Sequence, residues 1–463
     1  MSQTTGFSFS DRKTYLSYLA LLLFFVAAVV LIVVFGSKPQ IATENHGSTF
    51  WQNFRSPLSV LFIQIIVILA AAGLFSRLFR RINQPPVMGE MIAGIILGPS
   101  VLGFFFPEAM TFIFPASSLE TLRLLSQIGV VLFMFIVGME LNVRHVKEKG
   151  SAAVMISHAS IIVPFLLGAG LSLFLYKRLA PPGTSFSAFA LFIGVAMSIT
   201  AFPVLARILE DRGLSQTHLG SIAITCAAVD DVTAWCILAL VIALVQASGI
   251  AVSLVTIVFT LVFAAAMIFL VRPQLRRMVK QATGSHVHTR RLIAGVLAFV
   301  LISALVTETI GIHALFGAFV AGVVMPPSAD FRMFLREKLE AFSAAALLPL
   351  FFAFTGLRTQ IGLLNDWQSW AICGLIILVA VAGKLGGSML ASRWTGMSWS
   401  QSFSIGVLMN TRGLVELVVL NIGYDLGILS GRIFAMMVLM ALVTTFMTGP
   451  LLSLVNIRAK GIA

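Results

Sequence analysis

Charged residues are scarce in this sequence, since Asp, Glu, Lys and Arg make up only 11% of its 463 residues. Soluble domains usually carry about 25% charged residues, so this composition excludes an ordinary cytosolic fold. Cysteine is also rare, and Cys226, Cys236 and Cys373 all lie in apolar windows, which indicates neither a disulfide framework nor a metal site. The seven histidines form no H-E-x-x-H motif, which argues against that class of metalloprotease.

Long apolar runs dominate instead, because 59% of the residues are hydrophobic. A transmembrane helix needs roughly 20 apolar residues. Windows of about this kind run over Leu16–Gly36, Leu58–Phe75, Val87–Phe105, Leu122–Leu141, Ala152–Leu175, Ala188–Ile208, Leu219–Val245, Val252–Val271, Leu292–Val306, Ala314–Met325, Ala341–Gly356, Ser369–Ala391, Phe403–Ile422 and Ile433–Val455. They predict an all-α polytopic membrane protein with about 14 transmembrane helices. Because Ala314–Met325 is short, thirteen is the alternative count.

Basic loop residues predict how the chain is oriented. With fourteen helices, twenty-two of the thirty-one Lys and Arg fall in loops on the side of the amino terminus and seven on the other side. Basic loops stay in the cytoplasm, so we expect both termini there and read the net charge of +13 as a topology signal, not as nucleic-acid binding. We expect a bacterial inner membrane; a thylakoid or organellar membrane would give the same pattern.

Seven ionisable residues are expected at bilayer depth, where each is costly and indicates function by default. They are Glu90, Asp230, Asp231, Glu308, Lys384, Arg412 and Glu416. Glu90 lies one turn into its window and Glu308 at a helix end, so we expect structural or interfacial roles for these two.

Asp230 and Asp231 fall near the middle of their window, about 18 Å from its start at 1.5 Å per residue. Adjacent helical residues point about 100° apart, so the two carboxylates should have different partners. One of them could face Lys384, the only lysine placed to pair with it. The other could hold a proton or a small metal cation.

Two further segments carry polar residues at mid-window. Ser198 and Thr200 precede Pro203, which can break the helix and free backbone carbonyls as ligands for an alkali cation. Asn410 to Glu416 contains Arg412 and Glu416, which are four residues apart and can pair on one helix face. Whether Arg412 also faces the stretch around Pro203 stays open at this point.

The order of the windows suggests an internal repeat. We divide the chain into an extra amino-terminal helix and loop (1–57), a first six-helix repeat (58–246), a linker helix with a basic loop (247–291) and a second six-helix repeat (292–463). The two repeats begin on opposite sides of the membrane and are therefore inverted. The windows with Pro203 and with Asn410 correspond, which predicts two interrupted helices crossing near the midplane.

The chain resembles the monovalent cation/proton antiporter superfamily, in the branch with bacterial sodium/proton exchangers, potassium efflux systems and plant cation/proton exchangers. The resemblance rests on segments that appear in family order from about Leu58 onward: Asn83–Glu90, Gly138–Leu141, Ser198–Pro203, Ala228–Asp231, Pro349–Gly356, Gly383–Gly387 and Asn410–Gly413. The helix at Leu16–Gly36 lies outside the family core. A cytosolic nucleotide-binding domain, found in the potassium efflux members, is missing, which argues against ligand-gated efflux.

The resemblance implies a homodimer, each protomer having a scaffold and a mobile core that moves like an elevator. It implies that Asp231 is the ion-binding carboxylate, that Asp230 pairs with Lys384, and that Thr200 lies in the unwound stretch. We therefore expect a secondary antiporter, not an enzyme and without cofactors, in which an alkali cation and a proton compete at Asp231. Burial disfavours a bare carboxylate charge, so Asp231 could accept either ion. Sodium, potassium and lithium remain open as substrates, and a role in pH homeostasis would follow.

The sequence argues against two other functions of polytopic membrane proteins. A potassium channel would need a T-V-G-Y-G filter, which the sequence lacks. An intramembrane aspartyl protease would resemble Y-D and G-x-G-D motifs on separate helices. Tyr424 and Asp425 form such a Y-D pair, but we expect them in a loop, and Asp230 and Asp231 are adjacent on one helix, so they cannot flank a scissile bond.

Overall fold

The computed structural model describes residues 53–140, 150–214, 217–246, 250–282 and 289–454, and in these parts the chain is helical. The first half contains α3 (Pro57–Arg81), α4 (Pro86–Leu97), α5 (Leu102–Phe105), α6 (Pro107–Ile113), α7 (Ala116–Glu140), α9 (Gly150–Leu179), α10 (Phe186–Ser198), α11 (Phe202–Asp211), α12 (His218–Gln246) and α13 (Ile250–Ala266). The second half contains α14 (Arg272–Ala282), α15 (Thr289–Ile310), α16 (Ala314–Val323), α17 (Ala329–Phe342), α18 (Leu348–Arg358), α19 (Trp367–Val381), α20 (Gly387–Trp394), α21 (Trp399–Met409), α22 (Leu414–Asp425) and α23 (Gly431–Leu454). Short π-helical turns join α13 to α14, α17 to α18 and α19 to α20.

Each apolar window within the described residues coincides with a helix or a helix pair. Eleven helices in the described part are long and apolar enough to cross a membrane, or twelve with the bent pair α21 and α22. The helix α16 has only 10 residues, about 15 Å, and stays below that length. The window Leu16–Gly36 lies outside the described residues, so the count of fourteen stays a prediction. One expectation was wrong: Tyr424 and Asp425 form the last turn of α22 and not a loop.

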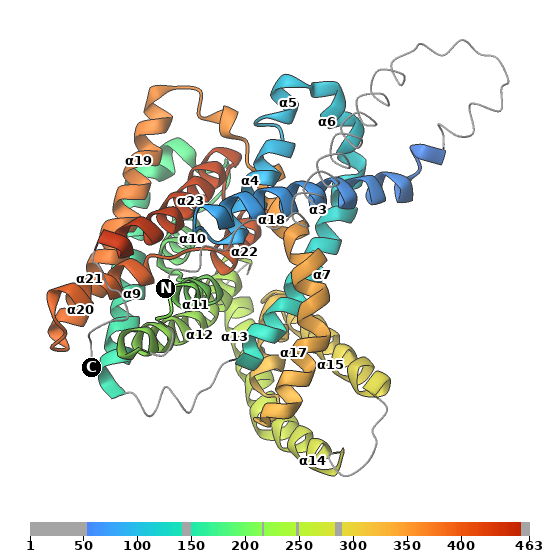
Figure 1. Cartoon of the computed structure of the whole chain (residues 1–463), viewed down its shortest axis with the longest axis vertical. Coiled ribbons are helices and arrows are strands. Elements are labelled where there is room, and N and C mark those ends of the chain that lie inside the picture. The colour runs from blue at the N-terminus through green and yellow to red at the C-terminus, as the bar shows by residue number, and fades with distance from the viewer. Residues whose placement is uncertain (1–52, 141–149, 215–216, 247–249, 283–288, 455–463) are drawn as a thin grey trace, which may run out of the picture.

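The helices pack as two bundles (Figure 1). One, here called the crossing bundle, consists of α9 to α12 and α19 to α23. The other, here called the flanking bundle, consists of α3 to α7 and α15 to α18. The helix α13 contacts α12 of the crossing bundle and α15 of the flanking bundle, so it links the two.

Glycines permit the closest approaches within the flanking bundle. A Cβ atom at Gly94 of α4 would lie 2.1 Å from the Ala353 carbonyl oxygen of α18, and one at Gly322 of α16 would lie 2.1 Å from the Phe135 carbonyl oxygen of α7. Small residues let helices pack this closely where no hydrophobic effect drives association. The two contacts pair α4 with α18 and α16 with α7.

Two spans of the crossing bundle are interrupted and meet at their interruptions. Ile199 to Ala201 separate α10 from α11, and Asn410 to Gly413 separate α21 from α22, whose axes differ by 42°. The Ala201 N–H donates to the Thr411 carbonyl at 3.0 Å, so the two breaks are joined directly. Pro203 lies in the first turn of α11, where its missing N–H is tolerated.

Candidate functional site

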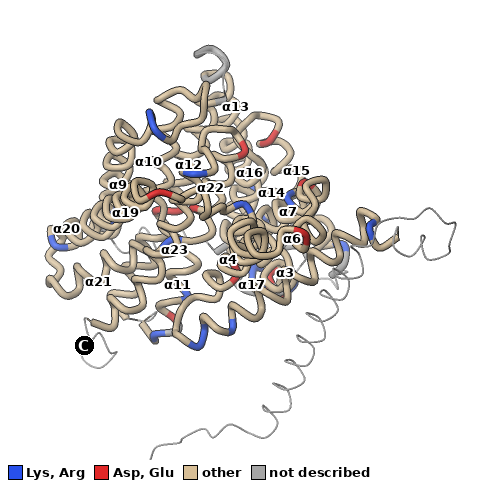
Figure 2. The backbone as a smooth tube through the Cα atoms, turned by 90° about the horizontal axis from the view of Figure 1, so that it is seen from above, with Lys and Arg blue, Asp and Glu red and all other residues tan. Residues whose placement is uncertain are grey.

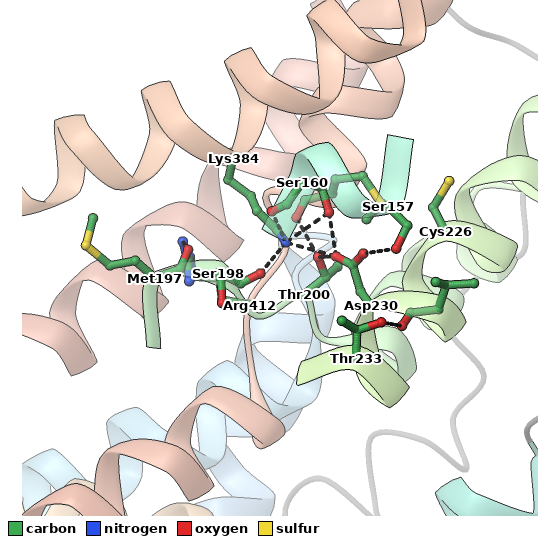
Figure 3. A network of polar contacts seen from close by, with 12 residues as sticks. Ser157, Ser160, Met197, Ser198, Thr200, Cys226, Asp230, Thr233, Lys384 and Arg412 are labelled. Carbon is green, nitrogen blue, oxygen red and sulfur yellow. Dashed lines mark hydrogen bonds and ion pairs between the residues drawn. The ribbon is translucent and has the colours of Figure 1, made fainter. Parts of the chain in front are cut away.

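Asp230 of α12 is a fully hydrogen-bonded carboxylate at the centre of the crossing bundle (Figure 3). It accepts hydrogen bonds from the hydroxyls of Ser157 at 2.5 Å, Ser160 at 2.6 Å and Thr200 at 2.7 Å. It also accepts one from the Lys384 ammonium at 2.9 Å. The side chain is 0% exposed, and these donors replace the water that it gives up on burial.

Lys384 reaches Asp230 from a π-helical turn, Ala382–Gly386, between α19 and α20. Its ammonium also donates to the backbone carbonyls of Ser160 at 2.8 Å and Ser198 at 2.5 Å. An ammonium has three protons, so one carboxylate and two carbonyls satisfy it. Buried charges are tolerated only when they are paired and hydrogen-bonded in this way.

A proline explains why the Ser160 carbonyl is available to Lys384. Pro164 lies inside α9, four residues after Ser160, and has no N–H to donate to that carbonyl. The π-turn packs directly against it, since a Cβ atom at Gly383 would lie 2.9 Å from the Cα atom of Pro164. Because the Ser160 carbonyl is free and residue 383 has no side chain, Lys384 can come close enough to α9 to donate to that carbonyl.

Asp231, the next residue of α12, is as deeply buried but differs in its partners. It is 1% exposed, and neither carboxylate oxygen has a hydrogen-bond partner among the described residues. The Phe202 N–H, in the first turn of α11, faces it but falls outside hydrogen-bonding geometry. A buried carboxylate in this situation requires a proton or a cation to balance its charge.

Arg412 occupies the break between α21 and α22 and turns toward the other interrupted span. Its guanidinium donates to the Ala196 carbonyl at 2.9 Å and the Met197 carbonyl at 2.6 Å, near the end of α10. It lies 3.4 Å from Glu416, in the i,i+4 arrangement expected from the sequence. Arg412 therefore satisfies helix-terminal carbonyls that would otherwise be unpaired, and it faces the stretch before Pro203.

The two hydroxyls predicted as ion ligands have other partners in this conformation. Ser198 donates its hydroxyl to the Val195 carbonyl at 2.8 Å, so only its backbone oxygen faces Lys384. Thr200 donates to Asp230 and lies 3.2 Å from the Met409 carbonyl. The structure thus joins Thr200, Ser198, Asp230 and Lys384 in one network, while Asp231 stays outside that network.

Sequence reasoning missed Ser157, Ser160 and Pro164 of α9. The two serines are three residues apart and present their hydroxyls to the same carboxylate. The signal was a Ser-x-x-Ser pair in an apolar window, followed by an internal proline.

Glu90 and Glu308 each accept a hydrogen bond from a nearby residue. Glu90 accepts from the Ser76 hydroxyl at 3.3 Å, and Glu308 accepts from the Ala314 N–H at 2.7 Å, where α16 begins. Within the described residues, no group of three or more His, Cys, Asp or Glu could hold a metal ion. An alkali cation at Asp231 would depend on that one carboxylate together with neutral oxygens.

The sequence matches a family profile described as "Sodium/hydrogen exchanger, transmembrane" over residues 65–456. It is 44% identical over 395 residues to Na(+)/H(+) antiporter NhaS4 of Synechocystis sp., covering 85% of this chain and 96% of that protein. It is 42% identical to Cation/H(+) antiporter 17 of Arabidopsis thaliana, covering 89% of this chain and 50% of that protein. For K(+)/H(+) antiporter 1 of Saccharomyces cerevisiae the identity is 35%, with 88% of this chain and 47% of that protein covered.

The chain spans about half the length of the plant and yeast relatives. Its fold is similar to that of the sodium proton antiporter MjNhaP1 from Methanocaldococcus jannaschii, with a TM-score of 0.66 and 14% identity over 88% of this chain and 100% of the other. The family resemblance of the sequence motifs is confirmed by these matches. The chain belongs to the sodium/hydrogen exchanger family, within the monovalent cation/proton antiporters.

Proposed function

We propose that this protein is a secondary antiporter that exchanges Na⁺ or K⁺ for H⁺, with both ions competing at Asp231. The observation that supports this most is the contrast between two adjacent buried aspartates. Asp230 has four donors, whereas Asp231 has no hydrogen-bond partner in the described part of the chain. One carboxylate is fixed in the structure, and the other is available to a transported ion.

Competition at one carboxylate is sufficient for coupled exchange. A proton or an alkali cation at Asp231 neutralises the site, and the empty site keeps a buried charge that is costly to move through a low dielectric. The crossing bundle therefore carries its site across the membrane most readily when one of the two ions is bound. The relatives are named for Na⁺/H⁺, cation/H⁺ and K⁺/H⁺ antiport, so both alkali cations stay candidates.

The test is proton efflux from acid-loaded proteoliposomes on addition of sodium, potassium or lithium, scanned over external pH. We expect at least one of the first two cations to release protons. Protein-free vesicles are the control, and a preparation that moves protons no faster than these vesicles with every cation would contradict antiport.

We propose an elevator-type movement in which the crossing bundle slides along the flanking bundle. Contacts between the bundles must then separate in each cycle. One set lies at the end of α22: Asp425 pairs with Arg358 of α18 and lies 3.5 Å from Arg123 of α7, and Asn421 accepts from Arg358 at 2.9 Å.

A cross-link at this end should stop exchange. In a background without native cysteines, Arg358→Cys with Asp425→Cys would join the two bundles through a short, cleavable thiol reagent. We expect cross-linking to abolish exchange and cleavage to restore it, because α22 could no longer slide.

The matched control is Arg123→Cys with Arg358→Cys. Both positions approach Asp425, but both belong to the flanking bundle. Cross-linked control protein should exchange at its uncross-linked rate. Undiminished exchange by the linked Arg358→Cys, Asp425→Cys protein would contradict a sliding movement.

Thr200 tests the ligand set around Asp231. Thr200→Ala removes a hydroxyl that could leave Asp230 and turn to a cation, so we expect a several-fold weaker apparent cation affinity. Thr233→Ala is the control, since the Thr233 hydroxyl donates to Val229 of its own helix. If Thr200→Ala lowers thermal stability but leaves the cation affinity unchanged, Thr200 only stabilises Asp230 and is not a cation ligand.

The orientation of the chain remains part of the proposal: both termini are cytoplasmic, in a bacterial inner membrane or an equivalent internal one. Tags at both ends should resist an external protease in intact cells. Cleavage of only one tag would contradict the count of fourteen helices and the inverted repeat that relates residues 58–246 to residues 292–463. A homodimer is also proposed, and the mass of the detergent-solubilised protein tests it.

A further inference from the structure

A basic cavity lies in the seam between the two bundles, on the side where the basic loops gather. It has a volume of ≈ 520 Å³ and is here called the seam cavity. The loop between α3 and α4 contributes one wall, and α11 and the end of α23 contribute the other. Its lining residues are Arg80, Asn83, Gln84, Pro85, Pro86, Arg207, Ile208, Arg212, Gly449 and Ser453. Figure 2 shows basic segments along the edge of the molecule beside α11.

Three arginines line the seam cavity, and no carboxylate does among the described residues. Arg80 takes part in none of the ion pairs of the described residues. Arg212 donates to the Gly449 carbonyl at 2.7 Å and to the Ser453 hydroxyl at 3.1 Å, which orients its guanidinium without neutralising it. Arg207 forms an ion pair with Glu210 at 3.4 Å, and both side chains are exposed to solvent.

The arginines come from both sides of the seam. Arg80 belongs to the flanking bundle, and Arg207 and Arg212 belong to the crossing bundle. The seam is tight beside them, since Gln84 donates to the Phe446 carbonyl of α23 at 3.3 Å. A ligand in this cavity would therefore contact both bundles at once.

Chemistry and position favour a lipid over a soluble anion. Guanidinium groups bind phosphate oxygens in bidentate geometry, and basic pockets between transmembrane helices on the cytoplasmic side suit phosphate headgroups. An apolar surface lies beside the cavity, because Leu78 and Ile82, two residues before and after Arg80, are 49% and 52% exposed. An acyl chain could lie along these residues while its phosphate enters the cavity.

We propose that the seam cavity binds the phosphate of an anionic lipid headgroup, which bridges Arg80 of the flanking bundle to Arg207 and Arg212 of the crossing bundle. The bound headgroup stabilises the relative position of the two bundles seen here. Because it contacts both bundles, it binds this arrangement more tightly than one in which they have slid apart. Anionic lipid then regulates exchange, a consequence that rests on the proposed sliding movement, whereas binding itself does not.

Binding is measured on the delipidated full-length protein by native mass spectrometry, with phosphatidylglycerol as the probe. We expect Arg80→Gln and Arg207→Gln each to weaken the tightest phosphatidylglycerol site by roughly tenfold, as for a lost charge-assisted contact. The control is Arg277→Gln on α14, an exposed arginine outside the cavity that carries the same charge change. All three side chains are exposed, so the variants should fold normally.

Two further probes separate the possible sources of phosphate. Phosphatidylcholine, which has no net charge, should bind weakly and with no dependence on Arg80. Inorganic phosphate should not displace phosphatidylglycerol. If inorganic phosphate binds with the same arginine dependence and the lipid does not, the lipid assignment is overturned. Equal phosphatidylglycerol affinity for wild type, Arg80→Gln and Arg277→Gln would overturn the site.

The regulatory step is measured in proteoliposomes of neutral lipid with and without phosphatidylglycerol. We expect the exchange rate of the wild type and of Arg277→Gln to change several-fold between the two membranes, and the rate of Arg80→Gln to stay the same. Arg80-dependent binding without any lipid effect on exchange would reject the regulatory step and leave the binding site intact. Absence of exchange in every membrane would reject the proposed function, not the lipid site.

Discussion

Asp231→Asn should abolish cation-driven proton movement while leaving the protein folded. Asparagine keeps the size of the side chain but removes the negative charge that a proton or a cation would neutralise. The wild-type carboxylate has no hydrogen-bond partner in the described residues, so the substitution breaks no hydrogen bond there, and an amide oxygen can still face the Phe202 N–H. We therefore expect wild-type expression and thermal stability together with exchange below a few per cent of wild type, in proteoliposomes acid-loaded as above.

The matched control is Asp366→Asn. Asp366 caps α19 by accepting from the Ser369 N–H at 2.5 Å, and asparagine caps helices about as well as aspartate. This variant makes the same chemical change outside the crossing bundle's centre and should exchange normally. Substantial exchange by Asp231→Asn would place ion binding at another residue.

The transmembrane fold was largely predictable because lipid imposes simple constraints. A helix that crosses lipid must satisfy its own backbone and be apolar for about twenty residues, so hydropathy alone located the described spans. Pro203 also indicated the break between α10 and α11. What hydropathy could not locate were local departures from an α-helix. The π-turn at Ala382–Gly386 has no distinct composition, and Tyr424 and Asp425 extended α22 by a turn beyond its apolar window.

The central network was only partly predictable. A single lysine among the apolar windows made its pairing with one of two aspartates the simplest expectation. Sequence spacing could not decide which aspartate, since that depends on the rotation of α12, and the assignment came from family resemblance. The contributions of Ser157 and Ser160 depend on how α9 faces α12, which is a tertiary property.

Thr200 also shows what the sequence can and cannot predict about a side chain. Its place in the break was predicted correctly, but the direction of its hydroxyl was not. In this conformation it donates to Asp230 and does not face a cation site at Asp231. Hydroxyls rotate freely, so the position of a residue in the chain does not determine which neighbouring group its hydroxyl bonds to.

Lys384 should determine how much charge each cycle moves. If the Asp230–Lys384 pair separates when a cation binds, Lys384 can release a proton and become a second proton carrier. The structure is compatible with a second, structural role, because Lys384 also donates to two carbonyls that join α9 and α10. Removing one partner of a buried ion pair destabilises a fold by about 3–5 kcal/mol, so Lys384→Ala alone cannot separate the two roles.

The double variant Asp230→Asn, Lys384→Gln separates them. It removes both buried charges, keeps amides that can bond to Ser157, Ser160 and Thr200, and leaves Asp231 intact. A buried pair replaced as a unit often costs little stability, so we expect this variant to fold. If Lys384 carries a proton, the variant should still exchange ions but neither generate a membrane voltage nor respond to one. A voltage-sensitive dye measures the first property, and the exchange rate under an imposed potassium diffusion potential measures the second. Voltage dependence equal to that of the wild type in the folded double variant would make Lys384 a structural residue. The second charge moved in each cycle would then have to travel by a route that includes neither Asp230 nor Lys384.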